Sequence, residues 1–506
     1  MRDGTFNYVY ILINGVLGLV VIPFMLIMLG RESYGVLVVV LSFANTALTL
    51  NFGLCWSINR HVAASHGSRE HPDAFVGSAA TISFLMGLAG AVVITLLAIP
   101  TARVLHLTPA VRASVPLVFF FGGLSSATSI VADFIASVFK GLRRFKENNM
   151  VILFTGMVRS TGTIALLLLG ARVREIALWY AIAGGIGVAT SLMVMGRVEP
   201  GYKLRLGAIR WSALRPHFLF GLASQGTRTV NALATQTLPI LFLGAVNGAS
   251  VAALYQVGQR LPLAGSEISG RMSEVVFTAA SEQARQHRRA AVGEILAVGT
   301  RWTAAVMLPI ALLLFIFAPS ILHAWVGIAD PAVVLVMRFI TVAVFVQAMG
   351  ETSSNVLFGM GNATTVLAIY AVAGVLGLLL ALALAYSFGM AGVAAGMIAN
   401  AACLTLLAVP FAASRCHIRV SQLSLSTVSG LVIPGAGCLA CAAALSWYVH
   451  PQRWLTLITA GSLSAMCYLL LFFTCGAREE ERLFLRKALG FLFRGWPRTE
   501  GASTSS

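Results

Sequence analysis

Residues 75–99 read FVGSAATISFLMGLAGAVVITLLAI, a stretch without a single charged side chain. An α-helix rises 1.5 Å per residue, so about 20 apolar residues are enough to cross the hydrocarbon core of a bilayer. Similar runs recur along the whole chain, which has 506 residues, 58% hydrophobic and only 10% charged. So little polar surface cannot cover soluble domains of this size. The sequence therefore predicts an all-α integral membrane protein.

About fourteen such runs can be placed, as a first group of six, a second group of six and a final pair. They cover residues 6–29, 35–58, 75–99, 114–138, 150–170 and 176–195, then 217–246, 251–280, 294–318, 334–358, 366–387 and 391–413, and finally 427–449 and 454–475. We expect two pseudo-symmetric six-helix lobes at 1–200 and 217–414, and two C-terminal helices within 415–476. The connector at 201–216 and residues 479–496 of the tail at 477–506 mix apolar with basic residues, which predicts amphipathic helices in the membrane interface. Residues 499–506 are expected to be disordered.

The Lys and Arg residues predict the orientation, because cytoplasmic loops retain positive charge. Most of the 35 fall in alternate loops, notably 140–146, 197–215 and 285–289, and in the tail. The opposite side holds Arg31, Arg103, Arg112, Arg172, Arg174 and Arg453. We therefore expect both termini in the cytoplasm. The first run carries polar residues and has spanning length, unlike the apolar core of a cleaved signal peptide, so we expect it to remain as a helix.

Polar side chains inside the predicted spans are the main functional signal, because such groups are costly unless they face a partner or water. At about 100° per residue, five polar residues of the eighth run fall on one narrow stripe of the helix: Gln256, Arg260, Glu267, Arg271 and Glu274. The seventh run has a similar stripe that includes Arg228 and Asn231. The first and second runs have stripes that include Asn14 and Asn45, respectively. We expect these four helices to line a hydrated, positively charged cavity between the lobes. The alternative is that the stripes are packing faces, since small and polar residues also join transmembrane helices.

The remaining ionisable residues within the spans have other expected roles. Asp133 and Arg159 lie on antiparallel neighbours, where a structural ion pair is expected, while Asp133 also remains an ion-coupling candidate. Glu351 either titrates during transport, as Glu267 could, or caps a helix end. Arg301 and Arg338 are near enough to helix ends to extend their side chains to the interface.

Features of an enzyme are weak in this sequence. It has no phosphate-cradling glycine-rich loop, and its histidines show no metal-ligand spacing. Cys438 and Cys441 have the spacing of a metal or redox pair, but no second pair completes a site. The outward loops near 100–113 and 319–333 are short and hold one acidic residue, Asp330. No catalytic residue, metal or cofactor is therefore expected, and the basic residues indicate a membrane face rather than a nucleic-acid partner.

Two groups of motifs carry a family resemblance. The first hairpin has LGRESYG at 29–35, followed by NFGL at 51–54 and the basic end Asn59-Arg60. The eighth run begins with AALY at 252–255 and ends with VFTAASE at 276–282. Over nearly the whole chain these features resemble the bacterial polysaccharide and O-antigen flippases (Wzx-type) of the multidrug, oligosaccharidyl-lipid and polysaccharide (MOP) exporter superfamily. The family often has a proline near Thr278, where this sequence departs from the pattern.

The resemblance implies a MATE-like fold of two lobes, alternating access, and transport of an undecaprenyl-pyrophosphate-linked oligosaccharide to the outer leaflet. Arg228 and Arg260, with Arg271 at the cytoplasmic entrance, would then contact the phosphates, assisted by Asn231, Gln256, Asn14 and Asn45. Glu267, Glu351 and Asp133 are the candidates for coupling to an ion gradient. The lipid bilayer and a polymerase or chain-length regulator complex are the further expected partners. A peptidoglycan lipid-precursor flippase and an ion-coupled multidrug exporter of the same fold remain as alternatives.

Overall fold

The computed structural model describes residues 2–48, 53–65, 74–199, 206–210, 225–286, 288–328, 330–479 and 481–482, and these ranges contain no β-strand. Their helices are α1 (Arg2–Leu48), α2 (Leu54–Ser65), α3 (Ala74–Leu96), α4 (Ala98–Val104), α5 (Pro109–Gly141), α6 (Phe145–Leu168), α7 (Val173–Val198), the π-helical turn η2 (Leu233–Thr237), α9 (Leu238–Asn247), α10 (Ala249–Arg285), α11 (Arg289–Ile316), α12 (Ala318–Val326), α13 (Pro331–Gly359), α14 (Ala363–Arg415), α15 (Val420–Val428), α16 (Val432–Val449), α17 (Trp454–Leu471) and η3 (Phe472–Gly476).

Eleven of the described helical segments are long and apolar enough to cross a membrane. Two of them are hairpins, because α1 breaks at Gly30 and α14 at Gly389, where φ is 78° and 53°. These positive φ values favour glycine, which has no Cβ to clash with the backbone. The helix α10 has 37 residues and is also long enough to span, but it carries the polar stripe. Counting both arms of each hairpin and α10, the prediction of an all-α protein with about fourteen spans is confirmed.

Three local features differ from the predicted layout. The second predicted span is interrupted, since α1 ends at Leu48 and α2 begins after Gly53, whose φ is 73°. The predicted outward loops contain the short helices α4 and α12, and α12 begins with Pro319 in its first turn, where a proline needs no N–H partner. Within the connector, residues 206–210 are not helical. Gly207 instead bonds through its N–H to the Gly77 carbonyl of α3 at 3.1 Å.

The rest of the predicted connector helix lies outside the described residues, as does the tail beyond residue 482.

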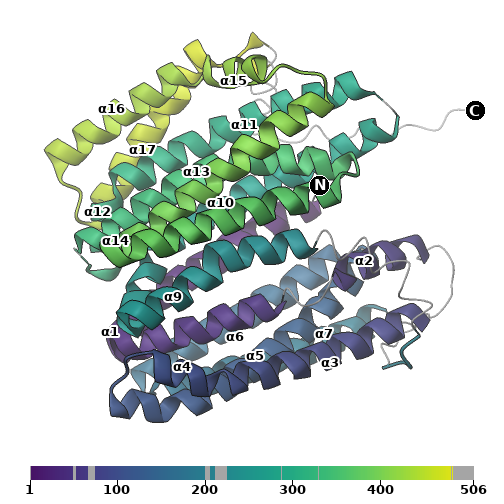
Figure 1. The fold of residues 1–506 in the computed structure, drawn as a ribbon, viewed down its shortest axis with the longest axis vertical. Helices are drawn as coiled ribbons and strands as arrows, with labels where there is room; N and C mark the ends of the chain where they lie inside the picture. Colours follow the sequence, from purple (N-terminus) through teal and green to yellow (C-terminus); the bar gives the residue numbers. More distant parts are fainter. Residues whose placement is uncertain are drawn as a thin grey trace, which may run out of the picture.

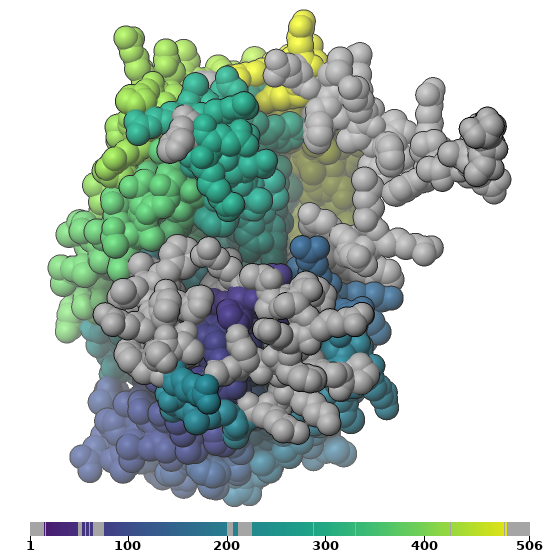
Figure 2. Space-filling model, turned by 90° about the vertical axis from the view of Figure 1, so that its right-hand side faces the viewer, coloured from purple at the N-terminus to yellow at the C-terminus, as the bar shows by residue number. Residues whose placement is uncertain are grey.

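The described helices form two lobes, stacked one above the other in Figure 1 and distinguished by colour in the end view of Figure 2. The first lobe contains α1 to α7. The second contains η2 to α14, and α16 and α17 pack on its outer side along α11.

The hydrophobic core shows how the lobes meet. At the basic ends of the helices there are two separate clusters, one around Phe139 in the first lobe and one around Leu296 in the second. At the opposite ends a single cluster joins residues of both lobes, from Val36 of α1 to Tyr255 of α10. There Gly35 lies so close to the Ala249 carbonyl that a Cβ would overlap it. The lobes are therefore packed together at one end and apart at the basic end.

One hydrogen bond between the lobes has a specific cause in the sequence. Pro23 lies inside α1 and has no N–H, so the carbonyl four residues earlier, that of Leu19, loses its helical donor. The indole N–H of Trp325, on α12 of the other lobe, donates to this carbonyl at 2.9 Å. The proline thus creates the acceptor that ties α1 to the second lobe.

We expect Trp325→Phe to lower the free energy of unfolding by about 1 kcal/mol, because a part-buried carbonyl is left without its donor. In a Pro23→Ala background, the backbone N–H of residue 23 can donate to the Leu19 carbonyl. Trp325→Phe should then lower the free energy of unfolding by clearly less. Thermal unfolding of the four proteins of this double-mutant cycle in detergent measures the difference. Equal costs in both backgrounds would show that lost packing, and not the hydrogen bond, is responsible.

Candidate functional site

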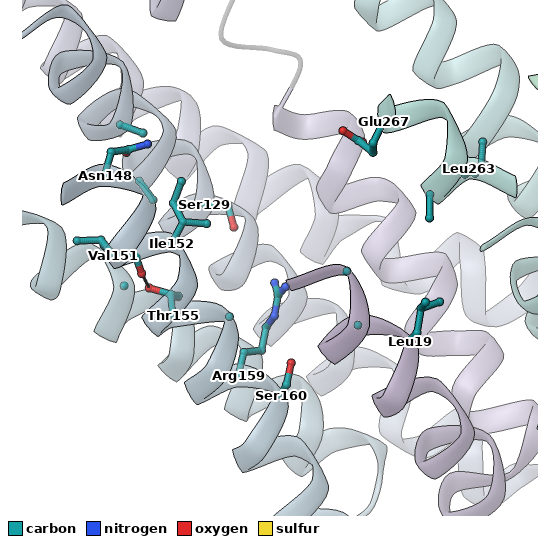
Figure 3. A pocket seen from close by; sticks show the side chains of 18 of the residues that line it. Leu19, Ser129, Asn148, Val151, Ile152, Thr155, Arg159, Ser160, Leu263 and Glu267 are labelled. Carbon is teal, nitrogen blue, oxygen red and sulfur yellow. Dashed lines mark hydrogen bonds between the residues drawn. The ribbon is translucent and has the colours of Figure 1, made fainter. Parts of the chain in front are cut away.

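A cavity of about 1050 Å³ lies between the two lobes. Its first-lobe walls come from α1, α5, α6 and α7, and its second-lobe wall comes from α10, with Gln236 of η2 beside it. Many lining residues are small or carry a hydroxyl group: Gly15, Gly18, Ser125, Thr128, Ser129, Thr155, Gly156, Ser160, Gly184, Gly187, Ser191 and Ser266. Figure 3 shows side chains from the two sides facing a common space, with Arg159 on one wall and Glu267 on the other.

The cavity occupies the half of each helix that is nearer to its basic end. On α6, which starts at the basic loop, the lining runs from Asn148 to Ser160. On α10, which ends at Arg285, it runs from Arg260 to Val275. The opposite halves of these helices belong to the shared core that closes the other end. The cavity therefore reaches from the middle of the spans toward the basic end.

The charges in this cavity are mostly positive. Its described lining contains three arginines, Arg159, Arg260 and Arg271, and one carboxylate, Glu267. Arg271 contacts Glu274 at 3.3 Å, and both side chains are about half exposed. An exposed pair of this kind contributes little binding energy and leaves the arginine available to a stronger anion. The lining therefore suits an anionic ligand that carries polar groups.

The predicted cavity residues are placed as follows. Arg260, Arg271 and Glu267 line the cavity, as expected from the stripe on α10. Gln256 is outside the lining, where its amide oxygen accepts a hydrogen bond from Gln259. Asn45 and Asn231 are also outside it. Asn14 lies outside the residues whose side chains the structure describes.

The second arm of α1 was expected to line the cavity but instead joins the lobes. Thr46 and Thr237 share a hydrogen bond between their hydroxyl groups, and the Thr237 hydroxyl donates to the Ser42 carbonyl at 3.5 Å. The polar stripe of this arm is therefore in part a packing face, the alternative left open by the sequence. On the first-lobe side the cavity is lined by the first arm of α1 and by α5, α6 and α7.

Arg228 and Glu351 form a separate polar group inside the second lobe. Arg228 is exposed but is not part of the cavity lining, and it lies within electrostatic range of the Glu351 carboxylate. Gln347 donates to Glu351 at 2.8 Å, and Glu267 is also within electrostatic range. Glu351 lies within α13, eight residues before its end, so it does not cap the helix. Arg228 is better placed to balance Glu351 than to contact a ligand in the cavity.

The ion pair expected between Asp133 and Arg159 is not formed. Asp133 is contacted by the Cys55 thiol at 3.3 Å, on the side of α5 that faces α2. Arg159 points into the cavity, and its Cζ lies 5.7 Å from the centroid of the Tyr180 ring. The helices α5 and α6 are neighbours, but the side chains of Asp133 and Arg159 project from faces that do not meet.

Arg301 and Arg338, whose side chains were expected to extend to the interface, bond to other parts of the protein. Arg301 is 2% exposed and bonds to Glu481, which follows η3 in the chain, at 2.6 Å. Arg338 donates to the Phe315 carbonyl at 3.1 Å and lies over the same residue's ring. Both arginines therefore have partners within the protein.

Sequence reasoning missed the first-lobe wall of the cavity, although a signal was present. On α6, Asn148, Thr155 and Arg159 follow one another at helical spacing and share one face, like the stripe recognised on α10. On α5, Ser125, Ser129 and the small residues that follow them do the same. The same angular test applied to these helices would have found a polar face on each, while the packing of the helices decides where that face points.

The family follows from comparison with known proteins. A family model described as polysaccharide biosynthesis protein matches residues 1–282, which include every residue of the cavity lining. The chain belongs to this family. No curated protein matches the sequence significantly. The solved structures with a similar fold include transporters and a flippase.

Solved structures with a similar fold are transporters of the MOP superfamily. The inward-facing conformation of a multidrug resistance MATE family transporter is 14% identical, with a TM-score of 0.66, over 81% of this chain and 95% of that one. The lipid II flippase MurJ, in an inward closed conformation, is 13% identical, with a TM-score of 0.66, over 96% and 99%. An outward-facing MATE family transporter gives a TM-score of 0.56 at 14% identity, over 83% and 94%. Identities this low establish the fold alone.

Proposed function

We propose that this protein is a flippase that moves an undecaprenyl-pyrophosphate-linked oligosaccharide from the cytoplasmic to the outer leaflet of the bacterial inner membrane. The cargo would be a repeat unit of O-antigen, capsule or exopolysaccharide. The proposal is supported by the family, by the fold and, above all, by the arginine-rich lining that the two lobes share. Moving phosphates and sugar hydroxyls through a medium of low dielectric constant is costly, and this lining lowers the cost.

The positions of the basic residues support the proposed direction. The described basic loops lie at the end toward which the cavity extends, and under the positive-inside rule this supports a cytoplasmic position for that end and for both termini. The chain would then be in an inward-facing state that takes up cargo from the cytoplasmic leaflet.

Deletion of the gene in its native host tests this function. We expect one surface polysaccharide to disappear and its undecaprenyl-linked repeat unit to accumulate, as measured by mass spectrometry of extracted lipids. Normal polymer in a strain without a redundant flippase would overturn the proposal and favour a small-molecule exporter, which ethidium efflux would reveal. Cell lysis with accumulated peptidoglycan precursor would instead identify the peptidoglycan lipid-precursor flippase.

Glu267 and Glu351, both in the second lobe, are the proposed sites of ion coupling. Glu267 faces the cavity and Glu351 lies behind it, within electrostatic range, so a cation bound by either changes the field of the arginine-lined space. We expect Glu267→Gln with Glu351→Gln to reduce export several-fold and to remove its dependence on the ion gradient. Export is measured as surface polymer before and after an ionophore is added.

Glu282, an acidic residue near the end of the same α10 helix and outside the cavity lining, gives a matched control. Glu282→Gln should leave export and its ionophore sensitivity unchanged. Full, ionophore-sensitive export by the double variant would exclude both carboxylates. Asp133, which lies away from the cavity, would then be the next group to test.

A further inference from the structure

Arg159 is held by two consecutive residues of α7. The indole N–H of Trp179 donates to the Arg159 carbonyl at 3.1 Å, and the next residue, Tyr180, lies under the guanidinium. Trp179 can reach α6 because position 162 is a glycine, where a Cβ would overlap the indole ring. The arginine thus has a fixed backbone and a supported side chain, although its charge has no acidic partner within the described structure.

Arg260 approaches the same place from the other lobe. Both Arg159 and Arg260 lie within electrostatic range of the Tyr180 side chain. Arg260 passes closely over α1, where its Nη2 lies 3.2 Å from the position that a Cβ of Gly18 would occupy. Two like charges from different lobes therefore face one space in the middle of the spans. Such charges are costly there unless a counterion or water compensates them.

We propose that Arg159 is a ligand-binding residue that forms, with Arg260, a site for a diphosphate held between the two lobes, and that Trp179 is a positioning residue for it. This inference rests on the proposed function, because it assigns the diphosphate of that cargo to particular side chains. A guanidinium presents its N–H donors in a fork that matches phosphate oxygens. One diphosphate carries enough negative charge to compensate both arginines, and the hydroxyl groups of Ser160 and Ser129 lie on the same wall.

Binding of inorganic pyrophosphate to the purified protein in phosphatidylcholine nanodiscs tests the site without requiring transport. We expect Arg159→Gln to weaken the affinity at least tenfold, because hydrogen bonds to charged groups contribute about 1.5–3 kcal/mol, and 1.4 kcal/mol is tenfold. Arg159→Lys should recover part of this loss, since it retains the charge but not the fork. Arg174→Gln, a change of the same kind at an exposed site outside the cavity, should have no effect.

Trp179→Phe separates positioning from general stability. It should weaken pyrophosphate binding about threefold or more, and it should have no further effect in an Arg159→Gln protein, because Trp179 acts through Arg159. Equal weakening in both backgrounds would overturn its positioning role.

If Arg260→Gln weakens binding but Arg159→Gln does not, the inference fails and the proposed function stands. If the wild-type protein binds no pyrophosphate, the inference and the anionic cargo of the proposed function both fail.

Discussion

Cells in which Arg260 is replaced by glutamine are expected to export polymer at roughly a tenth to a hundredth of the wild-type rate. Arg260 is the charged group that the second lobe contributes at the deepest described part of the cavity, and its guanidinium lies close to Gly18 of α1. A hydrogen bond to a charged group contributes about 1.5–3 kcal/mol, which corresponds to this range of rates if it is made during passage of the phosphates.

Surface polymer per cell, measured in a deletion strain that expresses each variant at equal level, checks this prediction. Arg260→Lys should be intermediate, because the ammonium group retains the charge but loses the forked geometry. Arg415→Gln removes an exposed arginine that lies over the Phe411 ring, outside the cavity, and should export normally. Full export by Arg260→Gln would show that this residue does not contact the cargo.

The largest effect on stability is expected at the C-terminal end of the described chain. Arg301, in the middle of α11, donates from Nε to Glu481 at 2.6 Å and from Nη2 to the Gly476 carbonyl at 2.7 Å. The side chains of Arg301 and Glu481 are only 3% and 11% exposed. Gly430 packs against this guanidinium so closely that a Cβ would meet it. The pair ties the segment after α17 to the second lobe.

We expect Arg301→Met to lower the free energy of unfolding by about 3–5 kcal/mol, because it leaves the Glu481 carboxylate buried without its main compensating charge. Replacing both residues by methionine should cost less than either single change, since no uncompensated charge remains. Thermal unfolding in detergent measures both. Arg144→Met provides the control, because the Arg144–Glu199 pair is 42% and 26% exposed and should contribute under about 1 kcal/mol. Similar losses from Arg301→Met and Arg144→Met would contradict the account.

The Arg301–Glu481 pair also predicts that the stability of the protein depends on pH. Burial opposes ionisation of Glu481, but hydrogen bonds from Arg301 and from the Arg478 N–H outweigh it and lower the pKa of Glu481. Because the folded-state pKa is below the unfolded value of about 4.3, the contribution to stability is complete above that pH. It is lost as the pH falls through the lower folded-state value. The stability difference between wild type and Glu481→Gln should therefore be constant near neutral pH and shrink in acid.

Much of the fold could be predicted from hydrophobic runs alone. The run predicted at 454–475 is found as α17 and η3, and the two runs predicted on either side of Gly389 are the two arms of α14. In these segments length and apolar character decide the structure, because the bilayer requires them. The interruption of the second span at Gly53, whose φ is 73°, was not predicted.

The candidate site was predicted only in part. The stripe on α10 is dense in charge, so Arg260, Glu267 and Arg271 could be placed in the cavity from one helix alone. Arg159 could not, because whether it faces Asp133 or the cavity depends on how α5, α6 and α7 are rotated against one another. The contacts of Trp325 with Leu19 and of Arg301 with Glu481 join residues 306 and 180 positions apart, which no local pattern reveals.

We propose that this cavity carries a lipid-linked oligosaccharide across the membrane. The most direct measurement is the sidedness of the undecaprenyl-linked repeat unit in spheroplasts of the deletion strain, using cold periodate as an oxidant that does not cross the membrane. With the wild-type gene restored, we predict that the glycan is oxidised; with an empty vector or Arg260→Gln, it should accumulate and remain protected. Oxidation of the glycan in spheroplasts that lack the protein and any redundant flippase would contradict the account.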